Sequence, residues 1–292
     1  MKPAPFTYHD PTTLEETLEL LATLDNAKIL AGGQSLMPMM NFRYVMPDHI
    51  VDVNRLIALR FIKIVGRNLE IGAGTRQRDL EFSDDVASCC PLMAEALAHV
   101  GHRQTRNRGT IGGSLCHLDP SAELPTVAMA TDATLHIAGK RGVRAVAMAS
   151  FPQGYMATCL EPSELLTGIT LPTWPKGHGY SFVEFARRRG DFAIVAVGAL
   201  LALDDNGSVS RASITLAGIG SAPIRLPRAE SILLGQTPSD SLFKEAAKIA
   251  QGIKAGADIH ASSDYRQHLA GILTSRALRQ ASSRAVPSAT LP

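Results

Sequence analysis

Two glycine-rich segments, far apart in the chain, restrict the possible folds more than any other feature of the sequence. Residues 31–36 read Ala-Gly-Gly-Gln-Ser-Leu, and residues 109–114 read Gly-Thr-Ile-Gly-Gly-Ser after two nearby arginines. Glycine adopts positive φ without strain and lets a ligand approach the backbone, so each segment can point several N–H groups at one anion. One such segment is typical of a surface loop, whereas two indicate a pair of cradles that could share one diphosphate.

A helix and a strand are predicted before the first glycine segment. Thr12 or Thr13, followed by two glutamates, is typical of a capped helix start, and leucines at 14, 18, 21 and 24 would share one buried face. The run 28–30 predicts a short buried strand that leads directly into the segment. We therefore expect the helix to pack beside the first cradle.

Apolar runs predict the remaining elements of the first part of the chain. Strands are expected at 49–53, 59–65, 69–73, 133–137, 143–146 and 165–171. Helices are expected at 78–85, 91–100 and 124–130. The strands at 59–65 and 69–73 should pair across a short turn, as should those at 133–137 and 143–146.

A domain boundary is predicted at 172–179, which contains two prolines and two glycines. Three antiparallel strands should follow, at 180–186, 193–203 and 209–219, with helices at 239–253 and 263–281. The fold class is therefore α+β, with domains at 1–175 and 178–282. The first domain should divide into sub-lobes at about 1–54 and 55–175.

Composition excludes several classes of protein. The 292 residues are 45% hydrophobic and 19% charged, with a net charge of +2, which is ordinary for a soluble globular protein. The sequence contains no basic block with interleaved aromatics, so nucleic acid is not an expected partner. No apolar run approaches the length of a membrane span. The N-terminus lacks the pattern of a secretory signal, so the cytoplasm is the expected location.

No catalytic or metal site of its own is expected in this chain. A Rossmann site needs G-x-G-x-x-G with an acid further on, and the glycine pairs at 72–74 and 218–220 lack the third glycine. No nucleophile elbow is present, and the histidines at 99, 102 and 117 lack a supporting ligand pattern. The four cysteines, at 89, 90, 116 and 159, show no spacing typical of an iron–sulfur cluster and are expected to be reduced thiols.

The two glycine segments, followed by Asp119-Pro120 and Glu123-Leu124-Pro125, resemble the FAD-binding motifs of the medium subunit of molybdenum hydroxylases. This group includes carbon monoxide dehydrogenase, quinoline oxidoreductase and xanthine dehydrogenase. The resemblance extends from residue 5 to about 279 and departs at Ser114, where many relatives carry asparagine. It implies a two-lobed FAD-binding domain of the PCMH, or vanillyl-alcohol-oxidase-like, type and a C-terminal domain with a three-stranded antiparallel sheet and helices.

The resemblance also implies which residues contact the cofactor. It places Glu123 at the flavin or its ribityl chain, Leu165 and Leu166 against the flavin, and Phe192 over the ring. The residue types alone favour simpler roles: a carboxylate at a helix start, core leucines, and a solvated loop at 187–192. The predicted cofactor-binding set is Leu30, Ala31, Gly32, Gly33, Gln34, Ser35, Leu36, Val100, Gly109, Thr110, Ile111, Gly112, Gly113, Ser114, Asp119, Glu123, Leu165, Leu166 and Phe192.

The implied function is electron transfer. An FAD-carrying subunit would receive electrons from [2Fe-2S] clusters on a small partner and deliver them to an external acceptor. A large molybdopterin subunit would oxidise an aromatic N-heterocycle, an aldehyde or CO, usually within a dimer of heterotrimers. The alternatives are a stand-alone FAD-dependent oxidase of related fold, for which we find no set of substrate residues, and a scaffold with degenerate loops.

Overall fold

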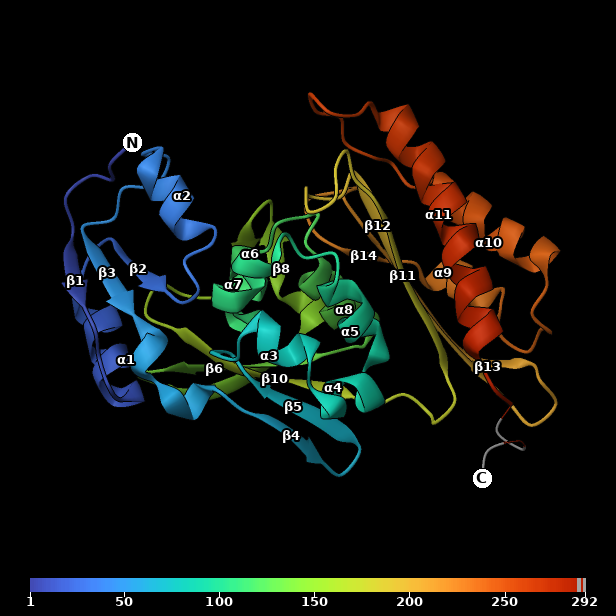
Figure 1. Cartoon of the computed structure of the whole chain (residues 1–292), viewed down its shortest axis with the longest axis horizontal. Coiled ribbons are helices and arrows are strands. Elements are labelled where there is room, and N and C mark those ends of the chain that lie inside the picture. The colour runs from blue at the N-terminus through green and yellow to red at the C-terminus, as the bar shows by residue number, and fades with distance from the viewer. Residues whose placement is uncertain (288–289, 291–292) are drawn as a thin grey trace.

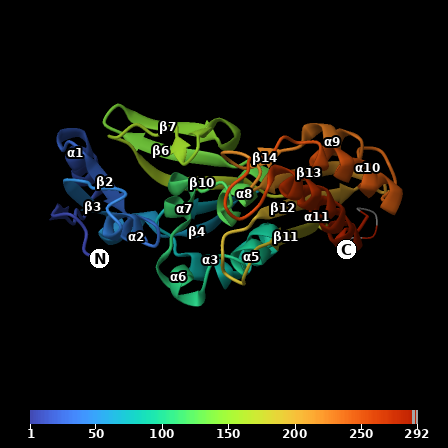
Figure 2. The same cartoon turned by 90° about the horizontal axis from the view of Figure 1, so that it is seen from above.

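The chain forms three lobes that follow one another along its longest axis (Figure 1). The computed structural model describes residues 1–287 and 290. The N-terminal and C-terminal lobes lie at opposite ends in both views, and the middle lobe separates them (Figure 1, Figure 2). None of the helices within the described residues is long and apolar enough to cross a membrane.

The N-terminal lobe is built on a three-stranded parallel sheet. Its strands are β1 (Thr7–His9), β3 (His49–Asp52) and β2 (Ala27–Leu30), in that order across the sheet. Helix α1 (Leu14–Thr23) begins at Thr13, whose hydroxyl accepts a hydrogen bond from the Glu16 N–H, so the capped helix is confirmed. The expected burial of the strand at 28–30 is wrong, because β2 lies at an edge of the sheet and leaves Lys28 exposed.

The middle lobe is built on a five-stranded antiparallel sheet in the order β4-β5-β10-β6-β7. Its strands are β4 (Ile62–Val65), β5 (Asn68–Gly72), β6 (Thr134–Gly139), β7 (Gly142–Ala147) and β10 (Leu165–Pro172). Both predicted hairpins are confirmed. Strand β4 starts three residues later than predicted, because residues 57–59 form a turn of 3-10 helix. A small hairpin of β8 (Pro152–Gly154) and β9 (Ala157–Thr158) was not predicted.

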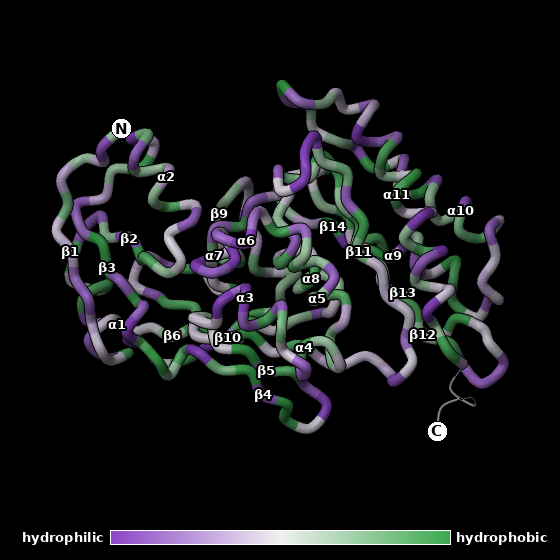
Figure 3. The backbone as a smooth tube through the Cα atoms, in the orientation of Figure 1, coloured by the Kyte–Doolittle hydropathy of each residue, from purple (hydrophilic) through white to green (hydrophobic). Residues whose placement is uncertain are grey.

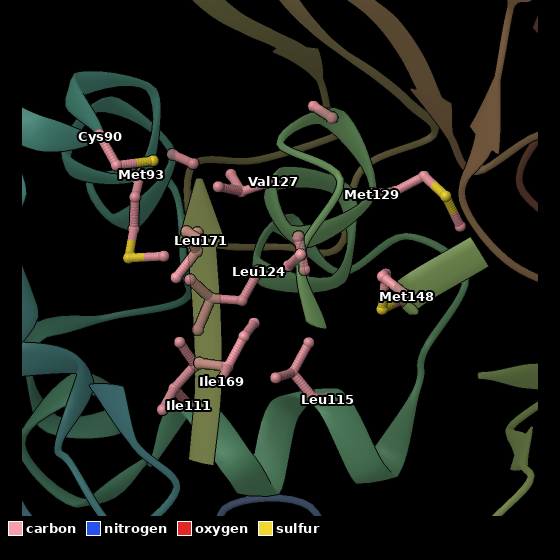
Figure 4. Close-up of a cluster of buried hydrophobic side chains, with 14 of the residues drawn as sticks. Cys90, Met93, Ile111, Leu115, Leu124, Val127, Met129, Met148, Ile169 and Leu171 are labelled. Atoms are coloured by element: carbon pink, nitrogen blue, oxygen red, sulfur yellow. The ribbon is translucent and has the colours of Figure 1, made fainter. Parts of the chain in front are cut away.

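Six short helices lie along one side of this sheet (Figure 1). They are α3 (Gln77–Glu81), α4 (Asp84–Cys89), α5 (Pro91–Leu97), α6 (Arg103–Arg108), α7 (Ile111–His117) and α8 (Glu123–Ala130). Figure 4 shows Ile111 and Leu115 of α7, Leu124 of α8 and Ile169 of β10 converging in one buried cluster. By contrast, α6 is hydrophilic along its length (Figure 3) and contributes no residue to the buried set.

The C-terminal lobe contains a four-stranded antiparallel sheet, so the predicted three-stranded sheet is wrong by one strand. Its strands are β11 (Gly179–Phe185), β12 (Val195–Leu203), β13 (Val209–Ala217) and β14 (Ile224–Arg225), and its helices are α9 (Pro227–Ser231), α10 (Asp240–Gln251) and α11 (Ser263–Arg284). The fourth strand has only two residues, too few to show an alternating pattern.

Both faces of the C-terminal sheet are buried. On β12, Ala196 and Leu200 belong to the core of the middle lobe, whereas Val195 and Val197 belong to the core that α10 and α11 cover. The proline-rich connection before β11 is also anchored, because the buried Trp174 ring lies 4.1 Å from the Arg211 guanidinium carbon. The C-terminal lobe is therefore packed on the middle lobe.

Candidate functional site

The two glycine segments meet at the junction of the N-terminal and middle lobes. A Cβ atom on Gly32 would lie 2.7 Å from the Gly109 Cα and closer still to the carbonyl oxygen of Arg108. A Cβ atom on Gly113 would lie 3.9 Å from the Cβ of Ala31. Only a residue without a side chain at position 32 permits this approach, so Gly32 allows the two lobes to share one site.

A cavity of about 370 Å³ opens beside the first segment. Its lining comes from the end of β2, the first glycine segment, α2 (Leu36–Asn41), the end of β3 with the turn after it, and the end of α6: Leu30, Ala31, Gly32, Gly33, Gln34, Met37, Pro38, Asn41, Asp52, Asn54 and Arg108. Five of the predicted cofactor-binding residues are in this lining. The cavity is therefore centred on the first segment.

The first segment presents free hydrogen-bond donors. Gly33 has a φ of +73°, a conformation that glycine adopts without strain. Across residues 1–287 and 290, no group accepts a hydrogen bond from the backbone N–H of Gly33, Gln34 or Ser35. Free N–H groups beside a cavity can bind an anion, which agrees with the sequence-based interpretation of this segment.

The second segment has a different role from the one predicted. Thr110 is the N-cap of α7, and none of the segment's glycines has a positive φ. The Gly112 N–H donates to the Ala73 carbonyl at 2.9 Å, and the Gly113 N–H donates to Thr110 Oγ1 at 3.0 Å. The expectation that these N–H groups point at an anion is therefore wrong, because the fold itself has already paired them.

One of the two flanking arginines is free to contact a ligand. Arg106 makes two hydrogen bonds to the Glu81 carboxylate, at 2.8 and 3.1 Å, and a third to the Val100 carbonyl at 2.9 Å. Arg108 is exposed, lines the cavity and has no side-chain partner in the described part of the chain. Arg108 was missed as a site residue, although its position directly before Gly109 could have indicated it.

Two polar residues were also missed, one at the end of β3 and one just after it. Asn54 donates from Nδ2 to the Ala31 carbonyl at 2.8 Å, and Asp52 accepts a hydrogen bond from the Tyr8 hydroxyl at 2.6 Å. That bond raises the pKa of Tyr8 to about 12. The available signal for both residues was their place at the end of the predicted strand at 49–53; its parallel pairing with the strand before the glycine segment is seen only in the structure.

The predicted acidic residues do not line the cavity. Glu123 at the start of α8 is 5% exposed, and this burial raises its pKa to about 8. Asp119, after α7, accepts a hydrogen bond from the Ser121 N–H, and burial raises its pKa. Near Glu123, the Nδ1 atom of His99 lies 3.2 Å from Glu184 Oε1, and this hydrogen bond raises the pKa of His99.

The remaining predicted residues are also outside the cavity. Phe192 is 60% exposed on the loop between β11 and β12. On that loop, Gly190 has a φ of +86°, and a Cβ atom there would lie 2.6 Å from the His102 ring, so the loop packs against the start of α6. Leu165 belongs to the core of the N-terminal lobe and Leu166 to that of the middle lobe.

Comparisons with known proteins agree over nearly the whole length of the chain. Residues 4–174 match the family described as FAD binding domain in molybdopterin dehydrogenase, and residues 180–281 match the CO dehydrogenase flavoprotein C-terminal domain. The chain is 40% identical to the 6-hydroxypseudooxynicotine dehydrogenase complex subunit alpha of Paenarthrobacter nicotinovorans, with 99% of this chain and 98% of the relative covered. It is 35% identical to the carbon monoxide dehydrogenase medium chain of Hydrogenophaga pseudoflava, with 97% and 99% covered.

Solved structures share the fold. A chain of carbon monoxide dehydrogenase from Hydrogenophaga pseudoflava superposes with a TM-score of 0.95 at 35% identity, covering 98% of this chain and 100% of that one. A chain of quinoline 2-oxidoreductase from Pseudomonas putida 86 gives a TM-score of 0.93 at 37% identity, covering 97% and 99%.

Proposed function

Because the chain belongs to the family of FAD-binding medium subunits of molybdenum hydroxylases, we propose that it is the FAD-carrying electron-transfer subunit of such an oxidoreductase. The observation that carries this proposal is the close approach of Gly32 to Gly109. It brings the free N–H groups of Gly33 to Ser35 and the Arg108 guanidinium to one cavity.

The residues of the cavity fit the diphosphate of FAD. Within the described residues, the three free N–H groups and the guanidinium are donors without acceptors. The bare backbone of Gly32 and Gly33 leaves room for phosphate oxygens. We assign the first segment and Arg108 to this diphosphate. The second segment contributes the close contact that brings Arg108 to the site. When bound, FAD supplies two-electron redox chemistry that can exchange electrons with one-electron centres.

We assign the other predicted residues to the flavin half of the cofactor. Phe192 is exposed, so its ring is available for an aromatic contact. Val100, Leu165 and Leu166 are buried, so any contribution they make is through the shape of the wall behind the site. Glu123 and Asp119 would supply carboxyl groups whose protonation depends on burial.

The partners are proposed from the same family membership. The names of relatives describe subunits or chains of larger enzymes, for example a medium subunit of nicotine 6-hydroxylase and a subunit of caffeine dehydrogenase. We propose a small iron–sulfur subunit with [2Fe-2S] clusters and a large molybdopterin subunit, in a dimer of heterotrimers that serves an external acceptor in the cytoplasm. The described residues contain four free cysteines and no group of side chains arranged to hold a metal.

We also propose the division of the chain into domains at 1–175 and 178–282. In this division the first domain binds FAD, and the second is the flavoprotein C-terminal domain. The connection between them contains Trp174, which is buried against Arg211 of β13. A packed connection favours two domains that move as one unit.

The test is purification of the chain with the polypeptides that accompany it. We expect stoichiometric FAD, released on denaturation from this chain, and iron and molybdenum that separate with the other polypeptides. The iron expectation follows because the four cysteines lack a cluster arrangement. Absence of flavin, or stoichiometric iron in the separated chain, would contradict the proposal.

A further inference from the structure

Arg76 connects segments of the chain that are distant in sequence. It lies directly before α3 and is half-buried. Its Nη2 donates to Asn54 Oδ1 at 2.5 Å, and its Nη1 donates to the Arg108 carbonyl oxygen. Because that carbonyl is the group against which Gly32 packs, Arg76 satisfies an acceptor at the point where the two glycine segments meet.

Asn54 extends this connection to the first glycine segment. It receives the Arg76 hydrogen bond on Oδ1 and donates from Nδ2 to the Ala31 carbonyl at 2.8 Å. Its own carbonyl accepts from Arg60. A continuous path of hydrogen bonds therefore runs from Ala31 through Asn54 and Arg76 to Arg108, and both Asn54 and Arg108 line the cavity.

The same residues concentrate positive charge beside the cavity. Burial lowers the pKa of Arg76, and the charges of Arg60 and Arg108 lower it further, against the smaller opposing effects of Asp79 and Asp52. The Asp52 carboxylate is already used by the Tyr8 hydroxyl and by Asn54. Three neighbouring guanidinium groups repel one another, and a bound anion would relieve that repulsion.

We propose that Arg76 is a positioning residue for the diphosphate of the cofactor: it fixes Asn54 and the Arg108 backbone so that the two glycine segments face one anion. This inference rests on the proposed function. Arginine suits the role because its planar guanidinium reaches acceptors on two different segments at once. A lysine ammonium is a compact point charge and cannot make the same bridge. Arg76 itself is outside the cavity lining and acts through Asn54 and Arg108.

The experiment uses the full chain in its complex as purified, stripped of flavin and titrated with FAD. Arg76→Met should weaken FAD binding by about ten- to a hundredfold, the usual effect of losing hydrogen bonds from a charged group. Arg76→Lys should not restore it, because lysine keeps the charge but loses the bridge. Arg67→Met is the matched control, since the Arg67 side chain is exposed on the β4–β5 turn and makes no hydrogen bond or ion pair within the described residues. This variant should bind FAD normally.

Two further measurements separate positioning from general damage to the fold. ADP, which carries a diphosphate but no flavin, should lose affinity for Arg76→Met by the same factor as FAD. Asn54→Ala removes the same path from its other end. Because both residues act in one path, the losses in Arg76→Met and Asn54→Ala should not add in the double variant.

The outcomes are distinct. A wild-type complex that binds no FAD would overturn both the proposed function and this inference. If the wild-type complex binds FAD, any one of four results would overturn the positioning role alone. These are an unchanged FAD affinity in Arg76→Met, full restoration of affinity by Arg76→Lys, an unchanged ADP affinity in Arg76→Met, and additive losses in the double variant. If Arg76→Met does not fold, the Asn54→Ala variant still decides, because normal FAD binding there would refute the path.

Discussion

The backbone of Gly32 lies directly against the backbone of Gly109, so that a Cβ atom at position 32 would stand 2.7 Å from the Gly109 Cα. Real Cβ atoms do not approach a backbone so closely, and the atoms opposite Gly32 are backbone atoms rather than the end of a flexible side chain. The contact therefore requires glycine at position 32. It also explains how residues almost eighty positions apart in the sequence come to share one cavity.

Replacing Gly32 by alanine should push the two glycine segments apart. We expect FAD content to fall sharply and the free energy of unfolding to drop by about 1–3 kcal/mol, the usual cost of inserting an extra methyl group into a packed contact. The measurement is flavin content per chain with denaturant unfolding. Gly256→Ala is the control, because a Cβ atom there would make only an ordinary contact at 3.8 Å. Full flavin content in a Gly32→Ala protein would contradict the assigned contact.

Replacing Gly112 by valine should damage the fold as well as the site. A Cβ atom at this position would lie 2.7 Å from both the Cβ and the carbonyl oxygen of Ala73, in the middle-lobe core. We expect the free energy of unfolding to fall by about 1–3 kcal/mol or more, so that the variant unfolds at a lower denaturant concentration. A variant with wild-type stability that has lost only its flavin would instead support the prediction from the sequence that the backbone at Gly112 binds phosphate.

Local features of the fold could be predicted from the sequence, and long-range partners could not. The Thr13 cap and the hairpin around Gly66 depend on neighbours within a few residues, so their patterns are visible in the chain. The Gly112 N–H is used by Ala73, almost forty residues earlier, and no local pattern contains that pairing. The sequence therefore located the glycine segments correctly but could not show that the N–H groups of Gly112 and Gly113 are already paired within the fold.

The same reason explains the incomplete prediction of the site. Arg106 and Arg108 are two residues apart and chemically identical, yet Glu81 engages only the first. Asn54 and Arg76 belong to other parts of the chain. Only the tertiary fold brings Asn54 to the cavity and Arg76 to Asn54. In the C-terminal lobe, β14 is a strand because β13 lies beside it, and its two residues carry no signal of their own.

The buried carboxyl of Glu123 should make stability depend on pH. Burial raises its pKa from 4.5 to about 8, so the folded protein holds this proton more tightly than the unfolded chain does. Stability from this group is therefore present below about pH 4.5 and is lost as the pH rises toward about 8. Glu123→Gln, which is always neutral, should gain stability relative to wild type as the pH increases. Thermal unfolding of both proteins across this range measures the effect, and a difference that does not change with pH would show that the carboxyl titrates normally.

Phe192 should affect the cofactor and its acceptor without affecting the fold. The ring is 60% exposed, so Phe192→Ala should change the free energy of unfolding by no more than about 0.5 kcal/mol. If the ring covers one face of the flavin, its removal should cost about 0.5–1.5 kcal/mol of FAD binding and alter the reaction with the external acceptor, while substrate still reduces the partner clusters normally. Rapid-mixing absorbance, followed separately at cluster and flavin wavelengths, makes this distinction.

The neighbouring Arg187→Gln is the control, because Arg187 pairs with Asp191 on the same loop and carries no ring. Unchanged FAD affinity together with unchanged flavin reoxidation in Phe192→Ala would place the ring away from the flavin.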